Sequence, residues 1–201
     1  MDESPKVTQA RSNVRADLGE HFGKAVFIRI FKENNTLELW VRNPNEQWHC
    51  LRTYKIAAMS GTLGPKTQEG DKQAPEGFYR VLPKSLNPYS KYHLSFNIGY
   101  PNNYDRALGR TGSYIMIHGG NDSAGCFALT DEKIEEIYTL VHEAFKADVK
   151  SVPVQIYPFR MTEARMMKER HNEHEEFWQH LVDGYRYTES FAAPYPDEDS
   201  Q

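Results

Sequence analysis

The hydrophobic pattern of this 201-residue chain changes its period at Thr130. Between residues 25 and 60 apolar and polar residues alternate, and KENNT and NPNEQ are typical of turns, so this stretch predicts a meander of three strands. Shorter alternating runs predict further strands at 78–82, 92–98 and 113–118. After Thr130 the apolar residues recur with helical spacing, which predicts a helix over about 131–147. Strands followed by late helices predict an α+β fold with a mainly β, curved and sandwich-like body.

The two ends of the chain differ from this body. The first 24 residues are rich in charge and weakly periodic, which predicts a loose or short helical lead-in. After another strand in VPVQIYPF, a second helix is expected from Thr162 to about Val182, followed by a frayed, Pro-rich acidic tail. We therefore expect a lead-in, a body, and a C-terminal helix with its tail packed on the body, at 1–24, 25–160 and 161–201.

Composition excludes several classes of function. With 24 Lys and Arg against 28 Asp and Glu, the chain has no clustered basic field of the kind that nucleic acid binding requires. No apolar run approaches the ~20 residues of a membrane span, and the polar start is unlike a signal peptide, so the chain as written is expected to be soluble. A chain from which a signal peptide had been removed would show the same polar N-terminal segment. Two cysteines, Cys50 and Cys126, are too few for a disulfide framework.

A histidine and a cysteine lie eight residues apart in the stretch IMIHGGNDSAGCFALT. Alternation places His118 at the end of a strand, and the flexible pair Gly119 and Gly120 lets the following loop return Cys126 towards the imidazole. A thiol needs such a base, because it is mostly protonated at neutral pH. Gly125 has no side chain, so backbone N–H groups around Cys126 are free to face a developing oxyanion. This spacing predicts a nucleophile and its base.

Two other interpretations of the same residues stay open. A Gly-rich turn that ends in a buried, inert thiol is common in proteins. A zinc site built from His118, Cys126 and either His93 or Cys50 is a weaker alternative, because the sequence has no C-x-x-C or H-x-x-x-H chelate. The histidines of HNEHEEFWQH favour a solvated helix face over a metal site. We therefore predict neither a metal nor a cofactor.

The long polar loop that follows the strand at 92–98 supplies candidates for substrate binding. Loops of this length in compact domains are usually functional or mobile. Arg106 and Arg110 lie on it, and a substrate with several carboxylates needs cations near the thiol. His93 and Tyr100 are the other two candidates in this region. The alternative is that Arg106 and Arg110 are ordinary solvated surface residues without a role in binding.

Several separated motifs together resemble one enzyme family. IMIHGGNDSAGCFALT resembles the H-G…S-x-G-C signature of the YkuD-type L,D-transpeptidases, and GDKQAPEGFYRV resembles the T-P-x-G-x-F/Y segment that precedes it. The likeness covers about residues 25–160. It implies a mainly β catalytic domain without metal or cofactor, which acts on peptidoglycan stem peptides that carry meso-diaminopimelate. By this resemblance Cys126 is the nucleophile, His118 is the base, Gly119 supplies a carbonyl that orients the ring, and Ser123 and Gly125 complete the loop.

The sequence also departs from the family pattern. Many relatives read S-H-G-C-I/V-R, whereas Ser123 to Ala128 read SAGCFA, without the second histidine and the arginine. The motifs AAMSGTLGPKTQEGDKQAPEGFY and FALTD resemble the YafK-like branch, which includes an enzyme linked to cutting covalently attached lipoprotein from peptidoglycan. The resemblance therefore favours a periplasmic hydrolase with Cys126 unpaired from Cys50. The alternatives are a transpeptidase that forms cross-links or attaches lipoprotein, and a non-catalytic cell-wall-binding module.

Overall fold

Two five-stranded sheets form the body of the protein in a computed structural model that describes residues 4–196. The first sheet has the order β3-β2-β1-β10-β5, with strands β3 Trp48–Lys55, β2 Thr36–Arg42, β1 Val26–Phe31, β10 Val152–Tyr157 and β5 Gly77–Val81. The second has the order β4-β9-β8-β7-β6, with strands β4 Ala58–Met59, β9 Phe127–Ala128, β8 Met116–His118, β7 Ser95–Asn97 and β6 Leu86–Asn87. The predicted meander is confirmed as β1, β2 and β3, which pair in antiparallel fashion.

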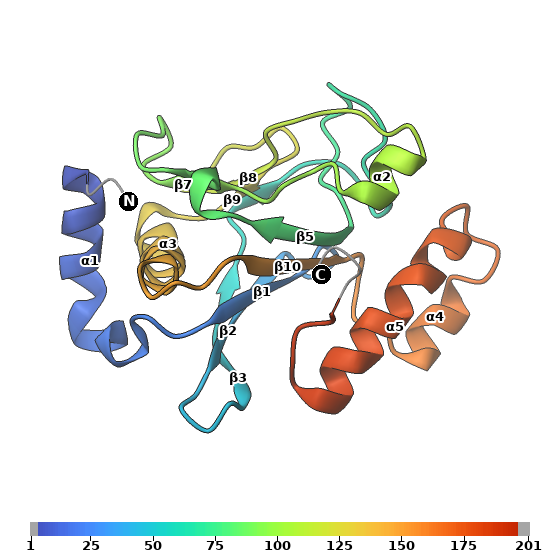
Figure 1. Ribbon diagram of the computed structural model, residues 1–201. Helices are drawn as coiled ribbons and strands as arrows, with labels where there is room; N and C mark the ends of the chain where they lie inside the picture. Colours follow the sequence, from blue (N-terminus) through green and yellow to red (C-terminus); the bar gives the residue numbers. More distant parts are fainter. Residues whose placement is uncertain (1–3, 197–201) are drawn as a thin grey trace.

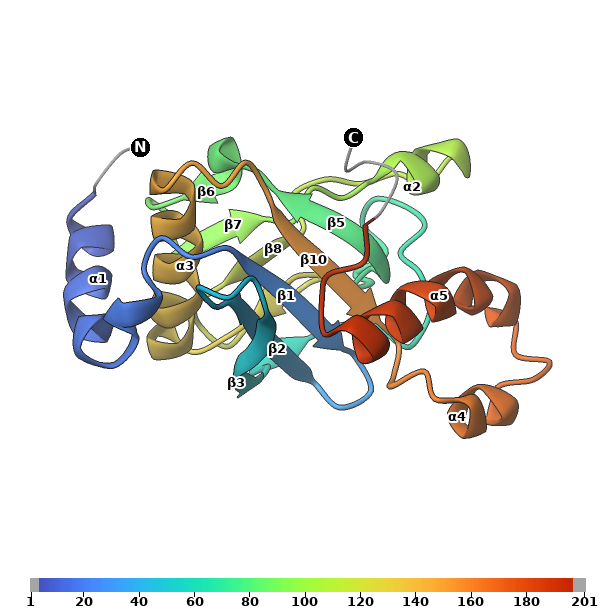
Figure 2. The ribbon, with the colours of Figure 1, turned by 60° about the horizontal axis from the view of Figure 1, so that its bottom comes forward.

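Helices lie at both ends of this body, as Figure 1 shows. They are α1 Pro5–Leu18, α2 Asn103–Ala107, α3 Asp131–Lys146, α4 Glu163–Lys168 and α5 Glu175–Phe191, with short 3₁₀ turns at η1 Gly19–His21 and η2 Pro83–Ser85. In both ribbon views α1 packs beside α3 at one end, and α4 and α5 lie at the other (Figures 1 and 2). Strands and helices in this arrangement confirm the α+β fold with late helices. None of the helices described here is both long and apolar enough for a membrane span.

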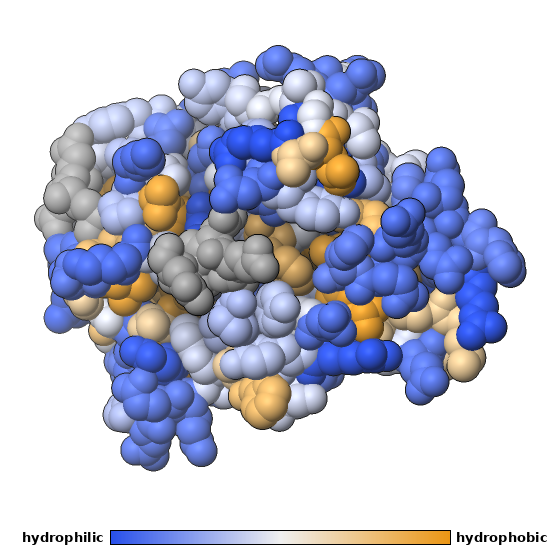
Figure 3. Space-filling view, turned by 45° about the vertical axis from the view of Figure 1, so that its right-hand side comes forward, coloured by the Kyte–Doolittle hydropathy of each residue, from blue (hydrophilic) through white to orange (hydrophobic). Residues whose placement is uncertain are grey.

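Alternation along β1 explains why the first sheet has two covered faces. Ile28 and Ile30 point into a core that also contains apolar residues of the second sheet, α1 and α3. Phe31 points to the opposite face, where it belongs to a second cluster with residues of α4 and α5. Arg29 lies between these apolar residues and is also buried. The surface on the side that carries α4 and α5 is mostly hydrophilic (Figure 3).

The helix predicted at about 131–147 is confirmed as α3, with Thr130 at its N-cap position. The prediction of a single helix from Thr162 to Val182 was wrong, because two helices occupy this region and α5 continues to Phe191. The chain turns between them at 169–174, where His171 has φ +72°, a backbone conformation that a helix cannot contain. Part of the expected frayed tail, 197–201, lies outside the described residues.

The lead-in is better ordered than a loose segment. Ser4 caps α1 by accepting a hydrogen bond from the Val7 N–H, and Pro5 starts the helix, a position that needs no N–H. Val7, Ala10, Val14 and Leu18 are buried, at the three- and four-residue spacing of one helix face. The helix therefore owes its stability to packing on α3, as part of the same core.

Candidate active site

The pairing of β8 with β9 places the histidine and the cysteine on one face of the second sheet. These strands are parallel, with Ile117 opposite Phe127 and His118 opposite Ala128. Ile117 and Phe127 are both fully buried in the core. Because side chains alternate along a strand, His118 and Cys126 both point away from that core pair. The prediction that His118 ends a strand is confirmed. After the loop of residues 119–125, Cys126 lies beside Met116, two residues before His118 in the neighbouring strand.

The imidazole of His118 is held in one orientation. Its Nδ1 lies 2.6 Å from the carbonyl oxygen of Gly119, which can only accept a hydrogen bond, so Nδ1 carries the proton and Nε2 presents a lone pair. The ring of Tyr92 covers it, with 4.6 Å between the ring centroids. Burial lowers the pKa of His118 below its usual value of 6.5. The ring is therefore neutral at pH 7 and able to accept a proton.

The backbone at Gly119 is fixed from both sides. Its N–H lies 3.1 Å from the carbonyl oxygens of both Tyr92 and Leu94. A Cβ at this position would lie 2.8 Å from the Tyr92 oxygen and 2.6 Å from a carboxylate oxygen of Asp131, so only glycine fits. Asp131, the first residue of α3, also accepts a hydrogen bond from the Gly120 N–H at 2.8 Å. These contacts hold the carbonyl that orients His118.

The Cys126 thiol is half-buried and has two backbone neighbours. The Met116 N–H lies 3.4 Å from Sγ as a donor, and the Tyr114 carbonyl oxygen lies 3.6 Å from Sγ as an acceptor. Burial raises the pKa of the thiol above 9, more than the N–H of Met116 and the charge of Lys66 lower it. The thiol is therefore protonated at rest and needs a base. As predicted, Cys126 and Cys50 are both free.

The loop before the thiol is held by two serines. Ser123 Oγ donates to the Cys126 carbonyl oxygen at 2.6 Å. Ser60 Oγ accepts the Gly125 N–H at 2.6 Å and donates to the Lys72 carbonyl oxygen, also at 2.6 Å. Gly125 has φ +102°, which favours glycine. Its N–H, one of the backbone groups around Cys126, is thus bonded to Ser60. Ser60 was not predicted as a site residue, although it lies in the motif AAMSGTLGPKTQEGDKQAPEGFY.

Three of the four predicted substrate-binding residues make contacts within the protein. His93 Nε2 lies 2.8 Å from Glu135 of α3, and the buried Tyr100 hydroxyl lies 3.2 Å from two backbone carbonyl oxygens. Arg110 forms a 2.8 Å ion pair with Asp105 and covers the ring of Phe177.

The fourth predicted residue, Arg106, differs from these three. It is exposed, and its hydrogen bond goes to the neutral side chain of Asn103 at 3.0 Å. Tyr100 and Arg106 line one groove, and His93 and Arg110 are not among its lining residues. Within residues 4–196, no group of three histidine, cysteine or acidic side chains is placed to hold a metal ion.

Comparison with known proteins adds a sequence relationship to this geometry. Residues 26–156 match the family YkuD, the L,D-transpeptidase catalytic domain. Over 172 residues the chain is 47% identical to "Putative L,D-transpeptidase YafK" of Escherichia coli K12, which covers 86% of this chain and 70% of that protein. The match to the protein of the same name in Escherichia coli O157:H7 has the same values.

Solved structures show the same fold at lower identity. The helical cell shape determining protein Pgp2 of Campylobacter jejuni aligns with a TM-score of 0.53 and 22% identity, over 78% of this chain and 59% of that one. A point variant of Pgp2 aligns with a TM-score of 0.55 and 20% identity, over 94% of this chain and 65% of that one. The chain thus spans less than two thirds of the Pgp2 chains. Family match and identity together show that this chain belongs to the YkuD family of L,D-transpeptidase catalytic domains.

Proposed function

We propose that this protein is a cysteine-dependent peptidoglycan enzyme that acts in the periplasm. Cys126 attacks the amide carbonyl on the L-centre of diaminopimelate in a stem peptide, and His118 transfers the protons. The observation that carries this proposal is the bond from His118 Nδ1 to the Gly119 carbonyl, beside a thiol on the same face of the sheet. That bond leaves Nε2 as the proton acceptor.

The proposed reaction starts from a neutral thiol and a neutral imidazole. Nε2 of His118 takes the thiol proton, and the sulfur of Cys126 forms a bond to the amide carbonyl carbon. The Met116 N–H, 3.4 Å from Sγ, stabilises the thiolate while it exists. When the tetrahedral intermediate collapses, the C–N bond breaks and His118 returns its proton to the leaving amine. The product is a thioester on Cys126.

The fate of this thioester separates a hydrolase from a transpeptidase. A transpeptidase must hold an amine acceptor and keep water away, whereas a hydrolase needs only to admit water. The positions of the missing histidine and arginine are held by Ala124, which is exposed, and Ala128, which is fully buried. Neither side chain has a polar group that could organise an acceptor. This favours hydrolysis, in which water attacks the thioester and releases the free carboxylate.

We further propose that the amine released is the C-terminal lysine of an attached lipoprotein. The test incubates the protein with muropeptides that carry this lysine, and separately with tetrapeptides and a free amine acceptor. Mass spectrometry should show release of the lysine-bearing peptide without incorporation of the acceptor, and no release with Cys126→Ala. Efficient formation of a new diaminopimelate cross-link would support the transpeptidase instead.

A further inference from the structure

A groove of about 500 Å³ runs along β5 and past the segment that connects β7 to α2. Among residues 4–196, its charged lining residues are Arg80, Lys84 and Arg106, and none of its lining residues there is an aspartate or glutamate. The whole chain has a net charge of −4, so this groove differs in sign from the average surface. A cleft lined by charges of one sign attracts ligands of the opposite sign.

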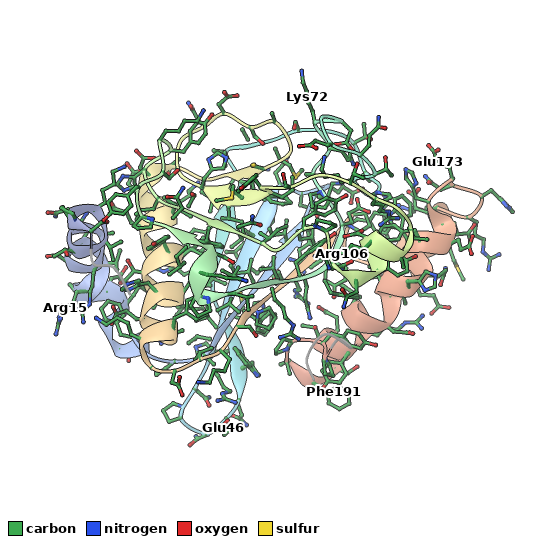
Figure 4. The ribbon with its side chains drawn as sticks, turned by 45° about the horizontal axis from the view of Figure 1, so that its top comes forward. Arg15, Glu46, Lys72, Arg106, Glu173 and Phe191 are labelled. Carbon is green, nitrogen blue, oxygen red and sulfur yellow. The ribbon has the colours of Figure 1, made fainter. Side chains whose placement is uncertain are left out.

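Two of these cations have no acidic partner in the part of the chain that the structure describes. Lys84 is exposed and forms no ion pair there, and the hydrogen bond of Arg106 goes to the uncharged Asn103. Arg110, four residues further on, is the contrasting case, because Asp105 neutralises it. In Figure 4 Arg106 lies beside α2 over the middle of the view, whereas Lys72 and Glu173 extend outward.

The groove begins next to the strand that contacts the thiol. Asn97, one of its lining residues, pairs with Met116, whose N–H donates to Cys126 Sγ. β7, β8 and β9 are consecutive strands, so Asn97 lies two strand spacings from the cysteine strand, or roughly 10 Å. An extended peptide covers this distance with about three residues. A substrate bound at Cys126 is therefore long enough to enter the groove.

Two contacts join the walls of the groove to each other. Asn102 Nδ2 donates to the Phe78 carbonyl oxygen at 2.9 Å and so ties the connecting segment to β5. Gly99 approaches β5 so closely that a Cβ there would lie 2.7 Å from the Arg80 carbonyl oxygen. Since both walls are joined by these contacts, a ligand does not need to order them, which lowers the cost of binding.

We infer that this groove binds carboxylates of the peptide substrate, with Lys84 and Arg106 as the cations that contact them. The inference rests on the proposed function, because it takes the substrate to be a stem peptide that bears free carboxylates. It assigns a role to Lys84, which the sequence did not indicate, and separates Arg106 from Arg110. Arg106 binds substrate, whereas Arg110 holds α2 and Asp105 in place.

The test measures binding without turnover, so that it stays independent of the reaction. Calorimetry compares Cys126→Ala with the same protein that also carries Lys84→Gln and Arg106→Gln. The ligands are a stem tetrapeptide with free carboxylates and its fully amidated analogue. The control carries Lys168→Gln and Arg170→Gln, which remove the same charge from exposed positions at and just beyond the end of α4.

We expect the groove variant to bind the acidic peptide at least about tenfold more weakly, because two charge-assisted contacts are lost. The control variant should bind it unchanged, and the amidated peptide should bind equally to all three proteins. Equal affinity of the groove variant for the acidic peptide, equal loss for both peptides, or no binding of the acidic peptide would each overturn the inference. If carboxylate binding depends on the groove but the wild-type protein cleaves no peptide, the proposed function alone fails.

Discussion

Two of the regions that contain buried polar side chains differ in charge. On the face of the first sheet that α5 covers, Lys32 and Glu76 form a 2.9 Å ion pair with side chains that are 1% and 0% exposed. Around the thiol, His118 bonds to a backbone carbonyl and Cys126 to a backbone N–H. The first pair is fully charged, whereas His118 and Cys126 are both neutral at rest.

The ion pair under α5 is fully hydrogen-bonded. Glu76 accepts from the Gly64 N–H at 2.7 Å and from the Trp178 indole N–H at 2.8 Å. Lys32 also donates to the carbonyl oxygens of Gly64 and Ala74, both at 2.8 Å. Buried charges persist only with such partners. The difference teaches that buried charges in this fold are paired and hydrogen-bonded, whereas the two groups of the candidate site are neutral where the proposed reaction moves a proton.

The largest expected effect concerns the neutral region of this comparison, the candidate active site. Cys126→Ala should abolish cleavage, because no other nucleophile lies at that position, while it changes the free energy of unfolding by less than about 1 kcal/mol. Turnover assays and thermal melts measure the two quantities. Cys50→Ala is the matched control and should keep full activity. Appreciable turnover by the Cys126 variant would remove the basis for covalent catalysis.

The second prediction concerns the charged region, the buried ion pair between Lys32 and Glu76. Lys32→Met leaves the Glu76 carboxylate buried without its cation, which should lower the free energy of unfolding by about 3–5 kcal/mol. Urea denaturation measures this loss. Adding Glu76→Gln should restore part of the stability, since the unpaired charge is then gone. A double variant that is no more stable than Lys32→Met would show that the charge itself is not the cause.

A smaller effect is expected at Ser60, which joins the β4 region to the loop before the thiol. Ser60→Ala removes the acceptor of the Gly125 N–H and should cost about 1–3 kcal/mol, divided between stability and positioning of Cys126. We expect kcat to fall by roughly tenfold with little change in KM. Ser12→Ala, an exposed serine on α1, is the control. An unchanged kcat would exclude Ser60 from positioning the nucleophile.

The smallest effect concerns pH. Burial holds the pKa of His118 below 6.5 in the folded protein, whereas the unfolded imidazole titrates near 6.5. Between these two values the unfolded chain binds more protons, so the stability contribution is complete above pH 6.5 and declines as pH falls toward the folded pKa. Urea denaturation from pH 8 to pH 5 should therefore show a steeper loss for wild type than for His118→Gln. Parallel curves would contradict the burial effect.

Local patterns predicted the secondary structure around the candidate site. The end of β8 at His118 and the start of α3 after Thr130 followed from alternation, helical spacing and capping, which act over a few residues. The single helix predicted after Thr162 is in fact two helices, and the second continues past the predicted end at Val182. The turn between them, near His171, depends on a backbone conformation that the apolar pattern does not record. Short-range physics therefore determined the secondary structure on either side of the proposed nucleophile and base.

Only the tertiary structure decided which distant residues come into contact. Ser60 meets Gly125 across 65 residues of chain, and Trp178 meets Glu76 across 102. Arg106 and Arg110 cannot be distinguished in the sequence, because both lie in one polar loop. In the structure Arg106 is exposed, whereas Arg110 is neutralised by Asp105. Periodicity and capping report the neighbours of a residue along the chain. The partners of a residue, its burial and the charge around it arise when distant segments pack, and no local pattern contains them.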